Sequence, residues 1–145
     1  MKTLLSIISL SILALLLQSA IRTSYSADET KSIHFFEGTF DEALEQAKKE
    51  NKLIFFDAYA SWCGPCKRMK SRVFTQDEVG SYFNANFINV KFDMEKGEGL
   101  ALARKYHVTA YPTLLFLNHK GEVEKAAVGY HNSNSLVELA KAVNQ

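Results

Sequence analysis

The stretch Trp62-Cys63-Gly64-Pro65-Cys66-Lys67 contains both cysteines of the 145-residue chain. Just before it, Leu53-Ile54-Phe55-Phe56 is continuously apolar, which is typical of a strand buried on both faces of a sheet. Just after it, Lys67 to Val73 has the composition of a helix. The sequence therefore predicts that Cys63 lies where a buried strand gives way to a helix.

Three interpretations of the cysteine pair are open. A structural disulfide is one, but so short a loop constrains little of the unfolded chain. A zinc site is another, but it needs about four ligands. The remaining ligands would have to come from histidines that lack close ligand spacing, namely His34, His107, His119 and His131. The third interpretation is a reactive dithiol.

The dithiol interpretation accounts for more of the motif. A thiolate in the first turn of a helix faces unpaired backbone N–H groups and the positive end of the helix dipole, which lower its pKa. Cys63 receives this effect and is expected to be exposed, whereas Cys66, one turn on, is expected to be more buried. Gly64 allows a partner chain to approach closely. Pro65 suits an early helix position because it has no N–H to leave unpaired.

Apolar patterns predict the other elements of an α/β fold. Strands are expected at 33–36, 53–56, 87–92, 113–117 and 123–128, the last two joined by a turn that ends in Gly121. Helices are expected from 40 to about 51, from 67 to 73, after 78, from 100 to 106 and near the C-terminus. Helix starts are predicted at capping boxes Thr39–Glu42 and Thr75–Glu78 and at Ser133 or Ser135. This order predicts a central mixed sheet with helices on both faces.

The first residues have the pattern of a secretory signal peptide. Lys2 precedes an apolar run from Leu4 to Leu17, and small residues end at Ser26-Ala27. We expect residues 1–26 to be removed and residues 27–145 to form one domain. An uncleaved membrane anchor is the alternative, although the apolar run stops short of the roughly 20 residues that a span needs. Export implies a periplasmic or secreted protein, in a compartment where disulfides persist.

The charge balance gives little support to nucleic acid as the main partner. The chain has 17 basic and 16 acidic residues, a formal net charge of +1. A nucleic-acid-binding domain usually has a clear basic excess.

The cysteine motif resembles the active-site sequence of the thioredoxin family. Two further stretches resemble that family at matching places, Phe56-Asp57-Ala58-Tyr59-Ala60 before the cysteines and Ala110-Tyr111-Pro112-Thr113 after them. The resemblance runs from about Phe35 to Val143. Details such as Lys67-Arg68-Met69-Lys70 are more similar to thioredoxin-like domains of secreted and periplasmic proteins, such as the C-terminal domain of the thiol:disulfide interchange protein DsbD.

The resemblance implies a thioredoxin fold and a role for each matching residue. Cys63 would be the nucleophile and Cys66 the resolving cysteine. Asp57 would be a buried carboxylate that accepts the Cys66 proton, and Lys91 would lie near it and tune that transfer. The remaining matches would bind substrate: Trp62, Gly64, Pro65, Tyr111 and Pro112. The peptide bond before Pro112 would be cis.

The implied activity is that of a thiol-disulfide oxidoreductase that reduces protein disulfides in the periplasm. Gly64-Pro65 is the pair found between the cysteines of reducing thioredoxins, and no histidine stands next to Cys66. The resemblance implies no cofactor or metal, disulfide-containing protein substrates, a membrane or protein electron donor and a monomer. The alternatives are a disulfide oxidase or isomerase and a non-catalytic binding or chaperone module.

Overall fold

The structure is a computed structural model that describes residues 32–144, so the expected signal peptide lies outside the described residues. The elements in chain order are α2 (Phe40–Glu50), β1 (Leu53–Tyr59), α3 (Gly64–Arg72), α4 (Asp77–Asn86), β2 (Phe87–Asp93), α5 (Gly99–Lys105), β3 (Thr113–Leu117), β4 (Val123–Val128) and α6 (Ser133–Val143). None of the helices within residues 32–144 has the length and apolar character needed to cross a membrane.

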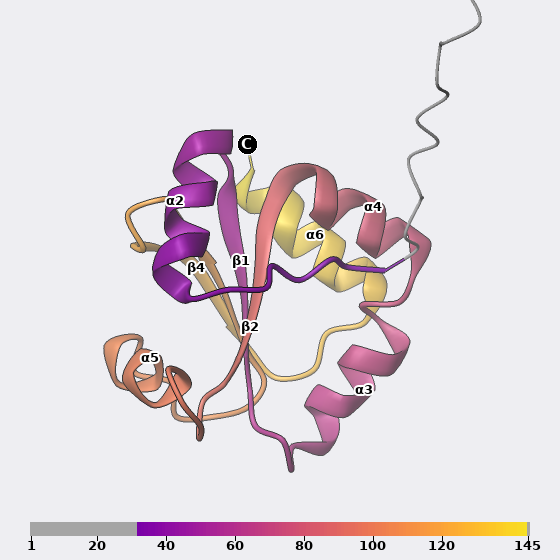
Figure 1. Cartoon of the computed structure of the whole chain (residues 1–145). Helices are drawn as coiled ribbons and strands as arrows, with labels where there is room; N and C mark the ends of the chain where they lie inside the picture. The colour runs from indigo at the N-terminus through magenta and orange to yellow at the C-terminus, as the bar shows by residue number, and fades with distance from the viewer. Residues whose placement is uncertain (1–31, 145) are drawn as a thin grey trace, which may run out of the picture.

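The sheet in this part of the chain has four strands in the order β2-β1-β3-β4. Strand β1 pairs in parallel with β2 and antiparallel with β3, and β3 pairs antiparallel with β4. Helices α2 and α5 lie on one side of the sheet, whereas α3, α4 and α6 lie on the other (Figure 1). The predicted mixed sheet with helices on both faces is confirmed.

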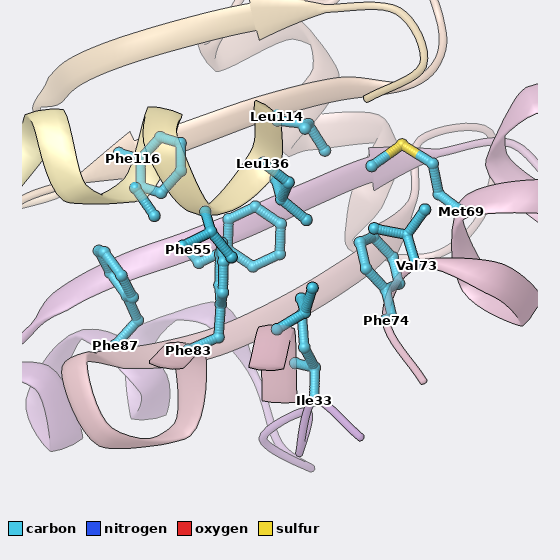
Figure 2. Packing of buried hydrophobic residues seen from close by; sticks show 13 residues of the cluster. Ile33, Phe55, Met69, Val73, Phe74, Phe83, Phe87, Leu114, Phe116 and Leu136 are labelled. Carbon is cyan, nitrogen blue, oxygen red and sulfur yellow. The ribbon is translucent and has the colours of Figure 1, made fainter. Parts of the chain in front are cut away.

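Strand β1 is the centre of the molecule because it packs on both faces. Successive side chains of a strand point to opposite faces, so Phe55 and Phe56 enter separate hydrophobic clusters. The Phe55 ring lies 4.6 Å from the Phe83 ring and 5.5 Å from the Phe116 ring, measured between centroids. Figure 2 shows this cluster between the sheet and the helices of the α3, α4 and α6 side. The strand continues beyond the predicted apolar run to include Asp57.

The strand expected at 33–36 is reduced to one bridge. Phe35 pairs with Asn89 of β2, and the Phe36 N–H donates to the Asn89 carbonyl oxygen at 2.7 Å. The side-chain amide of Asn89 donates to the His34 carbonyl oxygen. The segment therefore follows the edge of β2 without pairing along its whole length.

The predicted helix starts are confirmed at one place and wrong at two. Thr39 caps α2 in a complete capping box with Glu42. The Thr75 box is absent, because the Thr75 hydroxyl donates to a carbonyl oxygen of the preceding helix and α4 begins after Gln76, which has no capping bond. Helix α6 is capped by Asn132 instead of a serine, since its amide oxygen accepts from the Ser135 N–H.

Candidate active site

The two cysteines form a disulfide at the start of α3. Cys63 is the N-cap residue, and the backbone N–H of Cys66 donates to its sulfur at 3.2 Å. The predicted position of Cys63 between a buried strand and a helix is therefore confirmed. The same N–H can donate to a Cys63 thiolate after reduction, which favours the ionised form of that thiol.

The expected exposure of the two cysteines is wrong for this bonded state. Cys63 is only 2% exposed and Cys66 is 7% exposed, so the first cysteine is not the more accessible one. Tyr111 and Tyr59 pack against the small cluster that contains both cysteines. Tyr59 ends the preceding strand, whereas Tyr111 comes from the loop before β3, so a local motif does not reveal the second contact.

Asp57 lies behind the disulfide in the central strand. It is buried, with 6% of its surface exposed. Burial raises its pKa from 3.8 to about 7, although the positive charge of Lys91 acts in the opposite direction. Lys91 is its neighbour in the parallel register of β1 and β2. A cavity of about 330 Å³ is lined by Asp57, Lys91 and Cys66, so the fold brings these three expected site residues together.

The cavity has a partly aromatic wall. Phe35 and Phe74 line it, and their rings meet edge to face with centroids 5.6 Å apart. The Lys91 ammonium nitrogen lies 4.7 Å from the centroid of the Phe35 ring. The ring therefore holds a cation beside the buried carboxylate.

The remaining expected residues surround the disulfide. The Tyr111–Pro112 peptide bond is cis, and Pro112 is buried. Trp62 is 65% exposed, and its ring lies 5.9 Å from that of Tyr111. Gly64 and Pro65 are both exposed, and a Cβ at Gly64 would have no atom within 4 Å. The surface beside the disulfide is thus open at Gly64. The exposed Trp62 directly precedes Cys63 in the chain.

The loop after β2 contributes contacts that the sequence analysis missed. The Trp62 indole N–H donates to the Glu95 carboxylate at 2.8 Å. Lys96 donates to the Ser61 hydroxyl at 3.1 Å and pairs with Asp93 at 3.4 Å. Only the strand topology could have indicated these contacts, because the carboxyl ends of neighbouring parallel strands meet at one edge of a sheet.

Metal-binding groups are not assembled in the described part of the chain. Within residues 32–144, no three side chains of His, Cys, Asp or Glu are grouped so that they could hold a metal ion.

The fold and the site define a class of protein. A bonded Cys-X-X-Cys pair caps the helix that follows the central strand, and a buried carboxylate lies behind it. This arrangement is that of a disulfide oxidoreductase. Residues 40–144 match the family described as the thioredoxin-like domain. The chain belongs to this family, as the sequence motifs predicted.

Individual relatives differ in how much of them the chain covers. It is 33% identical to Thioredoxin-1 of Drosophila yakuba over 105 residues, which are 71% of this chain and 92% of that protein. It is also 38% identical over 74 residues to a peptide-N(4)-(N-acetyl-beta-glucosaminyl)asparagine amidase of Caenorhabditis elegans. Those residues are 51% of this chain but only 11% of the amidase.

Solved structures are similar over nearly the same region. A proposed disulphide-isomerase from Bacteroides thetaiotaomicron has 48% sequence identity and a TM-score of 0.70, covering 79% of this chain and 94% of that one. The C-terminal domain of Neisseria meningitidis DsbD has 22% identity and a TM-score of 0.62, covering 79% of this chain and 100% of that domain. The second likeness shows the thioredoxin fold alone.

Proposed function

We propose that the domain at residues 27–145 reduces disulfides of proteins in the periplasm or outside the cell, after removal of a signal peptide at residues 1–26. The observation that carries the proposal is the position of Asp57. This carboxylate has a pKa of about 7 and lines the same cavity as Cys66. A base is most useful there, because the resolving thiol must lose its proton before it can attack.

The proposed reaction has two exchange steps. The Cys63 thiolate attacks one sulfur of a substrate disulfide and forms a mixed disulfide, and the other substrate sulfur leaves as a thiolate. Asp57 then accepts the Cys66 proton, and the Cys66 thiolate attacks the Cys63 sulfur. The second substrate thiolate leaves, and the protein keeps the Cys63–Cys66 disulfide seen in the structure. Two electrons have passed to the substrate, so a membrane or protein dithiol must reduce the enzyme again.

The other residues have supporting roles in this proposal. Lys91 limits how far burial raises the Asp57 pKa, which keeps the carboxylate able to accept a proton near neutral pH. Trp62 and Tyr111 flank the disulfide, and the backbone of Tyr111, before the cis bond to Pro112, offers polar groups to an extended substrate. Gly64 leaves space for that chain to approach.

Two measurements test the proposal. The first is the equilibrium reduction potential of the Cys63–Cys66 pair in the mature domain. A value near about −270 mV, as in thioredoxin, supports a reductase, whereas a value between about −180 and −120 mV overturns that direction. The second is reduction of insulin with dithiothreitol as donor. The Cys63→Ser variant should lose this activity, and the Cys66→Ser variant should accumulate the mixed disulfide.

A disulfide isomerase is the second candidate function. Its support is the 48% sequence identity to the Bacteroides protein described as a proposed disulphide-isomerase. An isomerase restores activity to a scrambled disulfide protein without a continuous supply of reductant. Such recovery, together with a potential near about −180 mV, would favour the isomerase over the reductase.

A further inference from the structure

Helix α3 carries an unneutralised set of positive charges beside the disulfide. Four basic residues and no acidic ones lie on it, and all four side chains are exposed. They are distributed over the solvent-exposed half of the helix, opposite the buried Cys66 and Met69. We call this set the α3 basic face: Lys67, Arg68, Lys70 and Arg72. The ion pairs within residues 32–144 join Lys52 to Glu50 and Lys96 to Asp93, so none of them involves this face.

Interaction with the helix dipole explains the presence of only two of the four basic residues of the α3 basic face. Lys70 and Arg72 lie in the last turn, where a cation favours the negative end of the helix dipole. Lys67 and Arg68 lie in the first half of the helix, where a cation gains nothing from the dipole and is repelled near the N-terminus. Their presence beside the cysteines therefore needs another reason.

The α3 basic face is within reach of a substrate attached at Cys63. Residues rise about 1.5 Å each along a helix, which places Lys67 about 6 Å and Arg72 about 14 Å beyond the N-cap Cys63 along the axis. An extended peptide covers the longer distance with about four residues. Acidic side chains within about four residues of a substrate cysteine can thus lie along α3.

Aromatic side chains and a further cation adjoin the α3 basic face. The Arg68 guanidinium carbon lies 5.6 Å from the centroid of the Tyr130 ring, and 42% of the Tyr130 surface is exposed. Lys67 and Lys70 line the cavity that also receives Lys91. Exposed tyrosine, tryptophan and arginine are typical of surfaces that bind proteins. The partner that reaches Cys63 carries the reacting disulfide, so we take the occupant of this surface to be a polypeptide and not an anionic lipid.

We infer that the α3 basic face docks an acidic segment of the partner protein whose disulfide reacts at Cys63. This inference rests on the proposed function and specifies its substrate class. The partner's acidic residues lie within about four residues of the attacked cysteine, in the part of the partner chain that extends along α3. Electrostatic attraction then orients the partner and raises its association rate.

The test compares two disulfide peptides that differ in charge only. Each has one internal disulfide, and the four residues next to one cysteine are Asp and Glu in the first peptide and Lys in the second. We expect kcat/KM to be about tenfold higher for the acidic peptide at 0.01 M ionic strength. The preference should fall to about twofold or less at 1 M, where the Debye length is about 3 Å.

Charge-reversal variants assign the preference to the α3 basic face. The double variant Lys70→Glu/Arg72→Glu should invert the order of the two peptides. The ratio of the two kcat/KM values cancels any change in the intrinsic chemistry of the disulfide. The matched control is Lys48→Glu/Lys49→Glu, which changes net charge equally on exposed positions of α2. Helix α2 lies away from α3 (Figure 1), so the control should keep the original preference.

The outcomes separate this inference from the proposed function. Equal turnover of both peptides, or an unchanged preference in the α3 variant, overturns the docking surface and leaves the reductase intact. No turnover of either peptide refutes the reductase. Docking is then measured alone, by NMR titration with the acidic peptide carrying serines in place of cysteines. Amide shifts along α3 support docking. Their absence overturns it, as does binding only to phosphatidylglycerol vesicles.

Discussion

Replacing Asp57 with Asn should stabilise the folded protein, and the gain should depend on pH. The pKa of the buried carboxyl is raised from 3.8 to about 7, and each pKa unit corresponds to about 1.36 kcal/mol. A shift of about three units gives about 4 kcal/mol. The fold prefers the protonated form, so the native chain loses stability as pH rises from about 4 through about 7. The Asp57→Asn variant has no charge there and avoids this loss.

Urea unfolding of the oxidised protein at pH 4 and at pH 8 checks this prediction. We expect the variant and the native chain to be similar at pH 4 and to differ by up to about 4 kcal/mol at pH 8. Asp93→Asn is a control for which we expect the opposite change of stability with pH. Burial acts to raise the Asp93 pKa, but hydrogen bonds from the Glu95 N–H and Lys96 outweigh it and lower the pKa. An Asp57→Asn effect that is the same at both pH values would refute the burial argument.

Four further substitutions have defined outcomes. Phe55→Ala should reduce the free energy of unfolding by about 3–5 kcal/mol in a urea titration, because it empties a fully buried position. Thr39→Ala should cost about 1 kcal/mol through loss of a capping box, whereas Thr75→Ala, which removes no cap, should cost less than about 0.5 kcal/mol by the same assay. Glu95→Ala should shift the fluorescence emission of Trp62, the single tryptophan, because its indole N–H loses a carboxylate partner.

Elements with strong local signals could be predicted from the sequence. The expected strands at 113–117 and 123–128 match β3 and β4. Strand β3 is continuously apolar from Leu114 to Leu117, and the turn that follows ends in Gly121, whose φ of 77° suits glycine. The helix after Thr39 also starts where expected, because its capping box lies within four consecutive residues.

Features that depend on competing or distant partners could not be predicted. The Thr75 hydroxyl has a nearby carbonyl oxygen on Ser71, and that bond replaces the expected cap. Tyr111, one of the two tyrosines that pack against the cysteine cluster, comes from the loop before β3, and the partner of Trp62 comes from the loop after β2. No periodicity near the cysteine motif contains this information, because it arises only when the strands pair.

The parallel register of β1 and β2 is the point at which fold and proposed chemistry depend on each other. A slip of one residue would move Lys91 to the opposite face of the sheet, away from Asp57. The two rings just before Asp57 in sequence oppose such a slip: Phe55 packs against Phe83 on one face of the sheet, and Phe56 stacks on Phe92 at 5.5 Å on the other. The aromatic core therefore offsets the destabilising carboxylate and also keeps it in the cavity beside Cys66, where the proposed mechanism places a base.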